Sequence, residues 1–410
     1  MNDNETSPNR SGGAQILQWR PRPGTPRPAR SSPLGPPLRV LFVIDELDIG
    51  GTEQQILELV RHIDREQFEP HVCCFRYGRK AAEIASLGVP VHQEPKRLKA
   101  DPGLVLRLAG RMRRERYDIV QTYLWTANTW ARLAARLAGI PIVLASERNV
   151  DIWEETYKRV LGRWLARSTD CIIANSEAVR RYLLERGGLA PEKVVTIYNG
   201  VNFDRFRAPC DPRVRRDELG IPKNAVVAGV VARIEPAKDH GTLLQAMALI
   251  RDRVPLLHLV VVGGGREEEN LRRLCRELGI ADRVHFTGFR TDSAEWLQSV
   301  DFSVLSSVKE GLSNTVIESM AAGRAVAATD VGGNAEVIQQ DETGLVVPPR
   351  DPAALANAIT RLAESADLRD RFGRAGQKRV ETLFAIAPMV DQTERLYRTL
   401  AARTQRAAAA

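Results

Sequence analysis

The sequence predicts an α/β protein with two doubly wound domains, each built on a parallel sheet. The chain has 410 residues, more than one hydrophobic core usually organises. Short apolar runs with the length of buried strands alternate with longer amphipathic stretches along most of it. A proline- and charge-bearing stretch at residues 208–222 interrupts this alternation, as expected of an interdomain linker.

Residues 1–37 are expected to form a flexible tail without an assigned function, because they are rich in Pro, Arg, Ser and Gly and lack an apolar pattern. The polar start has no signal-peptide core, and no apolar run approaches the length of ~18 residues that a membrane span needs. The five cysteines form no Cys-x-x-Cys pair, which fits a reducing compartment. We therefore expect a cytoplasmic protein.

The net positive charge of the chain comes from its first half. Residues 1–208 hold 32 Lys and Arg against 24 Asp and Glu, whereas residues 209–410 hold 27 of each. This asymmetry indicates a basic surface that faces anionic lipid or an anionic acceptor. No recognisable nucleic-acid module accompanies it, so we expect no nucleic-acid partner.

The first domain is predicted to span residues 38–207. The loop after its first strand contains Gly50 and Gly51, and paired glycines at a strand-to-helix turn let the backbone approach a ligand. A tight turn alone would also need glycine. The expected strands are residues 39–45, 68–75, 89–92, 118–123, 142–146, 171–176 and 194–198.

Three residue groups follow strands of this domain, at the sheet edge where ligands bind. Gln121 and Tyr123 could line an acceptor cleft. Arg148 would place a guanidinium beside a phosphate or sugar, although a surface ion pair fits it equally well. Asn175 and Ser176 precede a helix and are better explained as its N-cap than as ligand contacts.

The helical stretches at residues 104–116, 130–137 and 157–167 mix Leu and Trp with many arginines. Such basic amphipathic helices are typical of peripheral contact with an anionic membrane. Half-buried surface helices would give the same pattern, so both interpretations stay open, with membrane contact slightly favoured.

The second domain is predicted to span residues 223–384. Arg233 and Lys238 bracket the loop after its first strand, where fixed positive charge would stabilise a departing diphosphate. The alternative is two ordinary surface cations. The expected strands are residues 226–234, 257–265, 284–290, 302–305, 325–328 and 343–348.

The most informative stretch is residues 306–329, a strand-end loop, a short helix and the next strand. The loop contains Gly311 and polar residues, so the helix N-terminus forms an anion site at the crevice. Glu310 and Glu318 bracket this site. Two simpler interpretations remain open: Thr315-x-x-Glu318 fits a capping box, and Glu310 fits a solvated loop acid.

Glu310, seven intervening residues, Glu318 and the following Ser-Met-Ala-Ala-Gly-Arg-Ala-Val-Ala-Ala-Thr closely resemble the donor-sugar motif of retaining glycosyltransferases of family four. Asn199-Gly-Val-Asn202 with Phe206 adds to the resemblance, which covers most of residues 38–400. It implies the GT-B fold, in which two Rossmann-like domains face each other across a cleft. A terminal helix, here residues 385–403, would cross back onto the first domain.

The resemblance also implies roles for individual residues. Arg233 and Lys238 would hold the diphosphate, Glu310 the sugar hydroxyls and Glu318 the ribose. Many relatives carry a histidine near Tyr123, which this chain lacks, so that role does not transfer. The remaining implied donor contacts are Gly50, Gly51, Arg290, Gly311, Leu312, Ser313 and Asn314.

The expected function is therefore transfer of a sugar, with retention, from a UDP- or GDP-sugar to a glycan acceptor. The acceptor is expected to be lipid-linked and to belong to cell-surface polysaccharide or lipopolysaccharide synthesis. We expect neither a metal ion nor another cofactor, because cations would neutralise the phosphates. Three alternatives remain: a phosphorylase or sucrose-type synthase of the same fold, a hydrolase or epimerase of nucleotide sugars, and a non-catalytic nucleotide-sugar-binding partner.

Overall fold

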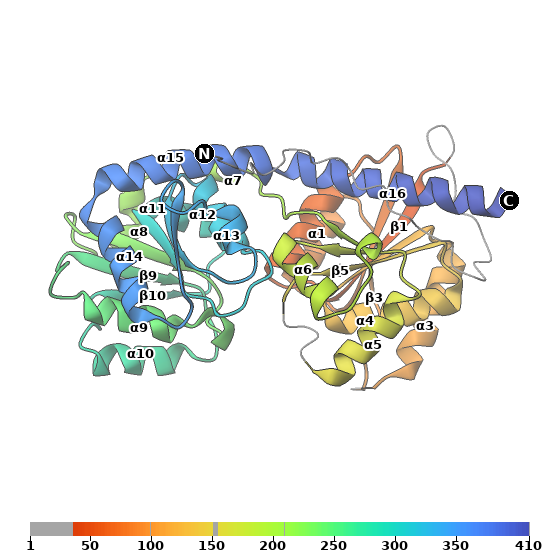
Figure 1. Cartoon of the computed structure of the whole chain (residues 1–410), viewed down its shortest axis with the longest axis horizontal. Coiled ribbons are helices and arrows are strands. Elements are labelled where there is room, and N and C mark those ends of the chain that lie inside the picture. Colours follow the sequence, from red (N-terminus) through yellow and green to blue (C-terminus); the bar gives the residue numbers. More distant parts are fainter. Residues whose placement is uncertain (1–35, 99, 151–154, 209, 410) are drawn as a thin grey trace, which may run out of the picture.

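The computed structural model describes residues 36–98, 100–150, 155–208 and 210–409, which form two α/β domains side by side (Figure 1). The expected tail lies outside the described residues, except for residues 36 and 37. Each domain holds one parallel sheet with helices on both faces, which confirms the predicted fold class. None of the helices in the described ranges is both long and apolar enough to cross a membrane.

The first sheet has seven parallel strands in the order β3-β2-β1-β4-β5-β6-β7. The order reverses between β1 and β4, which leaves a crevice at the carboxyl ends of these two strands. The strands are β1 (Leu38–Glu46), β2 (Phe68–Arg76), β3 (Val91–Gln93), β4 (Ile119–Tyr123), β5 (Ile142–Glu147), β6 (Cys171–Ala174) and β7 (Val194–Thr196).

The central strand β1 is buried on both faces, because its apolar side chains alternate between two cores. Phe42 and Ile44 pack into the core formed with α1, α2 and the last helix α16 (Ile386–Ala409), whereas Leu41 and Val43 pack into the core formed with α3 and α4. The helices are α1 (Gly51–His62), α2 (Arg79–Ser86), α3 (Pro102–Glu115), α4 (Trp125–Ala138), α5 (Thr156–Ala166) and α6 (Glu177–Glu185).

The second sheet repeats the plan with six parallel strands in the order β10-β9-β8-β11-β12-β13, and its switch point lies between β8 and β11. The strands are β8 (Val226–Val231), β9 (Leu257–Val262), β10 (Val284–Gly288), β11 (Phe302–Leu305), β12 (Ala325–Thr329) and β13 (Gly344–Val347).

Helices α9, α10 and α14 pack on one face of the second sheet, and α11, α12 and α13 on the other. They are α9 (His240–Leu249), α10 (Glu268–Glu277), α11 (Ser293–Ser299), α12 (Asn314–Ala321), α13 (Asn334–Val337), α14 (Pro352–Glu364) and α15 (Ala366–Leu383). Two short helices lie between the sheets in sequence, α7 (Asp204–Arg207) and α8 (Pro212–Glu218).

The chain passes between the domains twice, and the two crossings lie together. The N–H of Val201 donates to the carbonyl oxygen of Phe384 at 2.8 Å, and Val201 pairs with Ala385 in a β-bridge. The last helix, α16 (Ile386–Ala409), then returns over the first domain (Figure 1). There the Tyr397 hydroxyl donates to the buried side chain of Gln121. The predicted crossing of the terminal helix is confirmed, and the helix is longer than expected.

Candidate active site

The two switch points face one another across a cleft of about 1000 Å³, which lies at the upper end of the range for small-molecule sites. Residues of both domains line it. The site residues predicted from the sequence are on its wall, except Tyr123 and Gln121, whose side chains are buried in the first domain. These wall residues are Gly50, Gly51, Arg148, Arg233, Lys238, Arg290, Glu310, Gly311, Leu312, Ser313, Asn314 and Glu318.

Lys238 and Glu310 form an ion pair at the centre of the second domain's wall. The Lys238 Nζ lies 2.5 Å from the Glu310 Oε1, and the Ser307 hydroxyl donates to the same oxygen at 2.7 Å. The Ser306 hydroxyl donates to the carbonyl oxygen of Lys238 at 2.9 Å, so the loops after β8 and β11 are tied together. Glu310 is 9% exposed, which excludes the solvated loop acid.

Arg233 lies on the same wall with an exposed side chain, paired to Glu235 at 2.9 Å. The Arg233 charge also acts electrostatically on Glu53, which lies on α1 of the opposite domain. Burial raises the pKa of the Glu53 carboxyl, while the charges of Arg233 and Arg148 act in the opposite direction. The predicted pair Arg233 and Lys238 is therefore brought to one cleft wall, with Lys238 the less exposed of the two.

Helix α12 opens its N-terminus onto the cleft. Its N-cap is Ser313, whose hydroxyl accepts from the N–H of Val316 at 3.4 Å. Thr315 instead donates its hydroxyl to the carbonyl oxygen of Val231 at 2.8 Å, which ties α12 to β8. The capping box considered for Thr315 and Glu318 is therefore wrong, and Glu318 is left to face the cleft.

The backbone of Gly311 lies close against the first domain. A Cβ atom added to it would lie 2.1 Å from the carbonyl oxygen of Arg148 and 2.8 Å from the Oδ1 of Asn175. Both of these residues belong to the first domain. No residue larger than glycine fits there without a shift of the backbone.

A chain of side-chain hydrogen bonds crosses the cleft beside Gly311. Arg148 donates to the Oδ1 of Asn199, and the Nδ2 of Asn199 donates to the Oδ1 of Asn314 at 2.6 Å. The Nδ2 of Asn314 donates in turn to the carbonyl oxygen of Gly51 at 3.1 Å. Arg148 therefore fixes the domain contact through Asn199, which differs from the surface ion pair considered from the sequence.

The structure places Tyr123 in the core of the first domain, 2% exposed. Its hydroxyl accepts from the Nε2 of Gln121 at 2.7 Å, and the Arg148 guanidinium lies over its ring, 5.9 Å from the centroid. The strand ends here, but the side chain points inward rather than into the cleft. Arg148 lies between the Tyr123 ring and the cleft, so Tyr123 could influence an acceptor only indirectly, through Arg148.

Glu318 and Arg290 also line the cleft. Burial raises the pKa of Glu318, while Arg205 acts against this from 3.7 Å. Arg290 is held by two hydrogen bonds to the Asp292 carboxylate, both 2.8 Å long. Both residues are therefore oriented by charged neighbours.

The sequence reasoning missed Ser307, Asn199 and Arg205. Ser307 stands three residues before Glu310, a spacing at which a hydroxyl can reach a carboxylate within a loop. Its hydrogen bond to Glu310 could therefore have been predicted from the sequence. Asn199 stood in the motif noted before the linker, but its partners are far away in sequence. Among the described residues, no group of three or more His, Cys, Asp or Glu side chains is arranged to hold a metal ion.

Comparison with known proteins identifies the family. Residues 49–205 match the family described as Glycosyltransferase Family 4, and residues 213–379 match Glycosyl transferases group 1. A D-inositol 3-phosphate glycosyltransferase of Streptomyces scabiei is 31% identical over 346 residues, covering 79% of this chain and 73% of that protein. The chain belongs to glycosyltransferase family four.

Two further matches agree with this. A D-inositol 3-phosphate glycosyltransferase of Thermomonospora curvata is 30% identical to this chain over 378 residues, covering 82% of this chain and 88% of that protein. The crystal structure of Anabaena Alr3699/HepE in complex with UDP-glucose has a TM-score of 0.79 at 22% identity, covering 88% of this chain and 100% of that one. The family-four glycosyltransferase therefore has the GT-B fold, as the resemblance implied.

The close approach at Gly311 predicts the effect of a single methyl group. In Gly311→Ala the Cβ would meet the Arg148 carbonyl oxygen, so the domains must separate there. We expect sugar transfer to fall about 100-fold, because misplacement by roughly 1 Å has this effect. X-ray scattering in solution should show a more open molecule, with little change in the unfolding midpoint. Gly110→Ala on α3, whose Cβ meets nothing within 4 Å, is the control. A wild-type rate for Gly311→Ala would contradict the prediction.

Proposed function

We propose that this family-four glycosyltransferase transfers a hexose from a UDP- or GDP-sugar to a lipid-linked glycan, with retention and without a metal ion. The pathway would be synthesis of cell-surface polysaccharide or lipopolysaccharide, at the cytoplasmic face of the membrane. The observation that carries the proposal is the Lys238–Glu310 pair beside the N-terminus of α12.

The donor diphosphate would lie against Lys238 and Arg233, with the N-terminus of α12 directed at it. Negative charge develops on the diphosphate as the sugar leaves, and fixed cations and helix N–H groups in a partly buried cleft stabilise that charge. These groups provide the neutralisation that a divalent cation supplies in other enzymes. This is the basis for proposing metal independence.

The sugar would lie next to Glu310, and the nucleoside would extend towards Glu318 and Arg290. Ser307 and Lys238 hold the Glu310 carboxylate in one orientation, so it can accept hydrogen bonds from sugar hydroxyls. Glu318 would accept from the ribose. The UDP-glucose bound by Anabaena Alr3699/HepE, a protein of the same fold, supports a donor of this class.

In the transfer step the bond between the anomeric carbon and the diphosphate oxygen breaks, and a bond to the acceptor oxygen forms on the same face of the sugar. The proton of the acceptor hydroxyl passes to an oxygen of the leaving diphosphate. No protein side chain need act as general base in this scheme, so positioning and charge stabilisation account for catalysis.

The acceptor would enter from the first domain, beside Arg148. Helix α5 of that domain presents a row of exposed apolar side chains at helical spacing, namely Tyr157, Val160 and Trp164, which are 60%, 61% and 41% exposed. Arginines flank this row, as in helices that lie on anionic lipid. The row supports a membrane-bound acceptor.

Removal of either member of the central pair tests the assignment. We expect Lys238→Ala and Glu310→Ala each to lower kcat by about 10²- to 10⁴-fold, because each removes preorganised charge at the reacting centre. The measurement is sugar transfer from UDP- and GDP-hexoses. Lys378→Ala and Glu269→Ala, which remove exposed charges of the same domain, should transfer at wild-type rates. If Glu310→Ala lowers the unfolding midpoint, Glu310→Gln keeps the volume and still removes the charge. Near-normal rates in both site variants would remove the assignment.

Nucleotide binding without turnover can be tested by thermal unfolding. UDP or GDP at about 100 times its Kd should raise the unfolding midpoint by about 5 °C, because it binds only the folded protein. ADP should have less effect.

Metal independence can be tested with EDTA. We expect the thermal shift and the transfer rate to be unchanged in excess EDTA, and a rate abolished by EDTA and restored by a divalent cation would contradict metal independence. Turnover that needs inorganic phosphate instead of nucleotide would favour the phosphorylase.

Membrane contact through α5 can be tested with vesicles. Replacement of Tyr157, Val160 and Trp164 by serine together should weaken sedimentation with phosphatidylglycerol vesicles about tenfold or more, since buried apolar area supplies much of such binding. Salt should weaken wild-type binding further. Leu249→Ser removes an exposed apolar side chain of the second domain and should have no effect. Equal sedimentation of the triple variant and the wild type would rule out this surface.

A further inference from the structure

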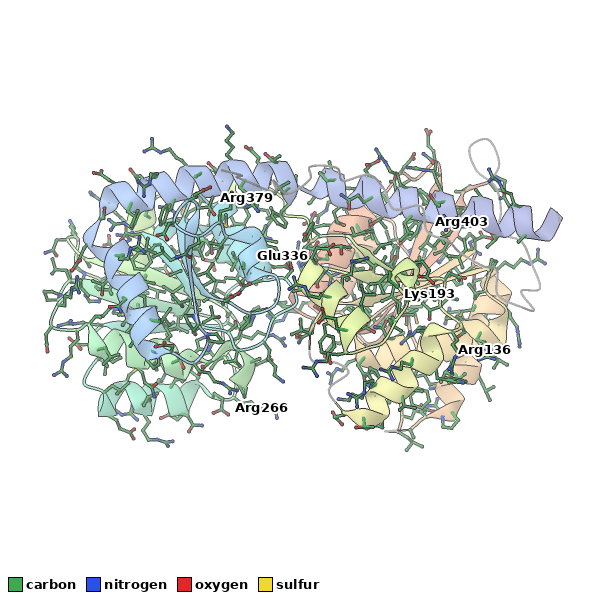
Figure 2. The ribbon with its side chains drawn as sticks, viewed as in Figure 1. Arg136, Lys193, Arg266, Glu336, Arg379 and Arg403 are labelled. Atoms are coloured by element: carbon green, nitrogen blue, oxygen red, sulfur yellow. The ribbon has the colours of Figure 1, made fainter. Side chains whose placement is uncertain are left out.

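A carboxylate of the second domain accepts hydrogen bonds from a helix of the first. Glu336 lies on α13, and Figure 2 shows it between the two domains. Its Oε2 accepts from the N–H of Glu177 at 2.9 Å, and its Oε1 accepts from the N–H of Ala178 at 2.7 Å. Both donors are in the first turn of α6, so two charge-assisted hydrogen bonds join the domains at this point.

The N-terminus of α6 is capped from both domains. Ser176 accepts from the N–H of Val179 at 3.1 Å, as its predicted N-cap role requires, and Glu336 takes the two N–H groups before it. Three first-turn donors of the helix are thereby satisfied. A negative charge at this helix end is also favoured by the helix dipole. Opening of the domains would leave two of these donors to water.

The Glu336 carboxylate accepts a third hydrogen bond, and the backbone of its helix is held by Arg379. The Tyr198 hydroxyl donates to its Oε2 at 3.0 Å, and burial together with the Glu336 charge raises the pKa of Tyr198. The Tyr198 ring packs edge-on against Phe384, which lies at the second crossing between domains. Arg379 on α15 donates to the carbonyl oxygens of Glu336 and Val337, both at 2.8 Å, and so holds α13 in place (Figure 2).

The same helix end is connected to the sugar-binding loop. The carbonyl oxygen of Gly311 accepts from the Ser176 hydroxyl at 2.9 Å and from the N–H of Gly333 at 2.7 Å. Gly333 directly precedes α13, which carries Glu336, and Gly311 directly follows Glu310. The loop that carries Glu310 and the start of helix α13, which carries Glu336, therefore meet each other and the first domain at one place.

We propose that Glu336 is a positioning residue for the transfer reaction. The Glu336 clasp, which consists of its carboxylate, the N–H groups of Glu177 and Ala178 and the Tyr198 hydroxyl, stabilises the closed arrangement of the domains. Through Gly333 and Gly311 the clasp also sets the loop that carries Glu310, so this loop is in place for transfer only when the cleft is closed. The consequence for rate rests on the proposed function, whereas the consequence for closure does not.

The test replaces the carboxylate. We expect Glu336→Ala to lower kcat about 10- to 100-fold, because the closed state is populated less. The Kd for UDP, measured by calorimetry at full stoichiometry, should change less than about threefold, since most of the proposed nucleotide contacts lie in the second domain. Glu336→Gln, which keeps one oxygen acceptor, should fall between Glu336→Ala and the wild type.

Hydrogen exchange and solution scattering provide readouts that do not need turnover. The amides of residues 177 and 178 should exchange faster in Glu336→Ala, and the molecule should be more open. Glu364→Ala is the matched control, because the Glu364 carboxylate also accepts two hydrogen bonds, at 2.8 and 3.0 Å from Arg253, but within the second domain.

Unchanged kcat and unchanged exchange in Glu336→Ala would overturn the proposal. A loss of UDP stoichiometry in parallel with kcat would also overturn it, because the residue would then serve folding alone. If the wild type transfers no hexose from any nucleotide sugar tested, the proposed function fails. Faster exchange and a more open molecule in Glu336→Ala would still support the clasp in that case.

Discussion

The site depends on one backbone contact between the domains. Gly311 lies so close to Arg148 and Asn175 that its position excludes any side chain. Glu310 precedes Gly311, and the N-terminus of α12 follows it. The contact therefore places the Glu310 carboxylate, the N-terminus of α12 and the Arg148 guanidinium of the opposite domain around one small volume. Hydrogen bonds through Asn314 and Asn199 hold the same arrangement beside it.

The sequence was sufficient to predict the fold and much of the cleft wall. Alternating buried strands and helices predict a doubly wound parallel sheet. In such a sheet the carboxyl ends of all strands lie on the same edge, so the residues that directly follow the strands come together there. Lys238 and Glu310 follow different strands, β8 and β11, which the topology makes neighbours. Their meeting at 2.5 Å is thus a consequence of strand order.

The sequence was insufficient to predict a contact where a side chain can adopt either of two orientations, or where its partner lies far away in the sequence. Tyr123 ends a strand, but its hydroxyl is satisfied inside the domain by Gln121, which itself bonds to α16. Thr315 fitted a capping box, yet it bonds to β8 and leaves the cap to Ser313. Glu336 contacts residues about 160 positions away in the chain, a pairing that no local pattern encodes.

The return of α16 also affects how the protein is made. Met389, Leu396 and Tyr397 on this helix belong to the core of the first domain, together with strands translated at the beginning. During synthesis that domain leaves the ribosome with part of its apolar interior uncovered, and the second domain can assemble before the missing helix arrives. The part of the enzyme synthesised first is therefore the part completed last, and ribosomes that stop early would release chains with an exposed apolar groove.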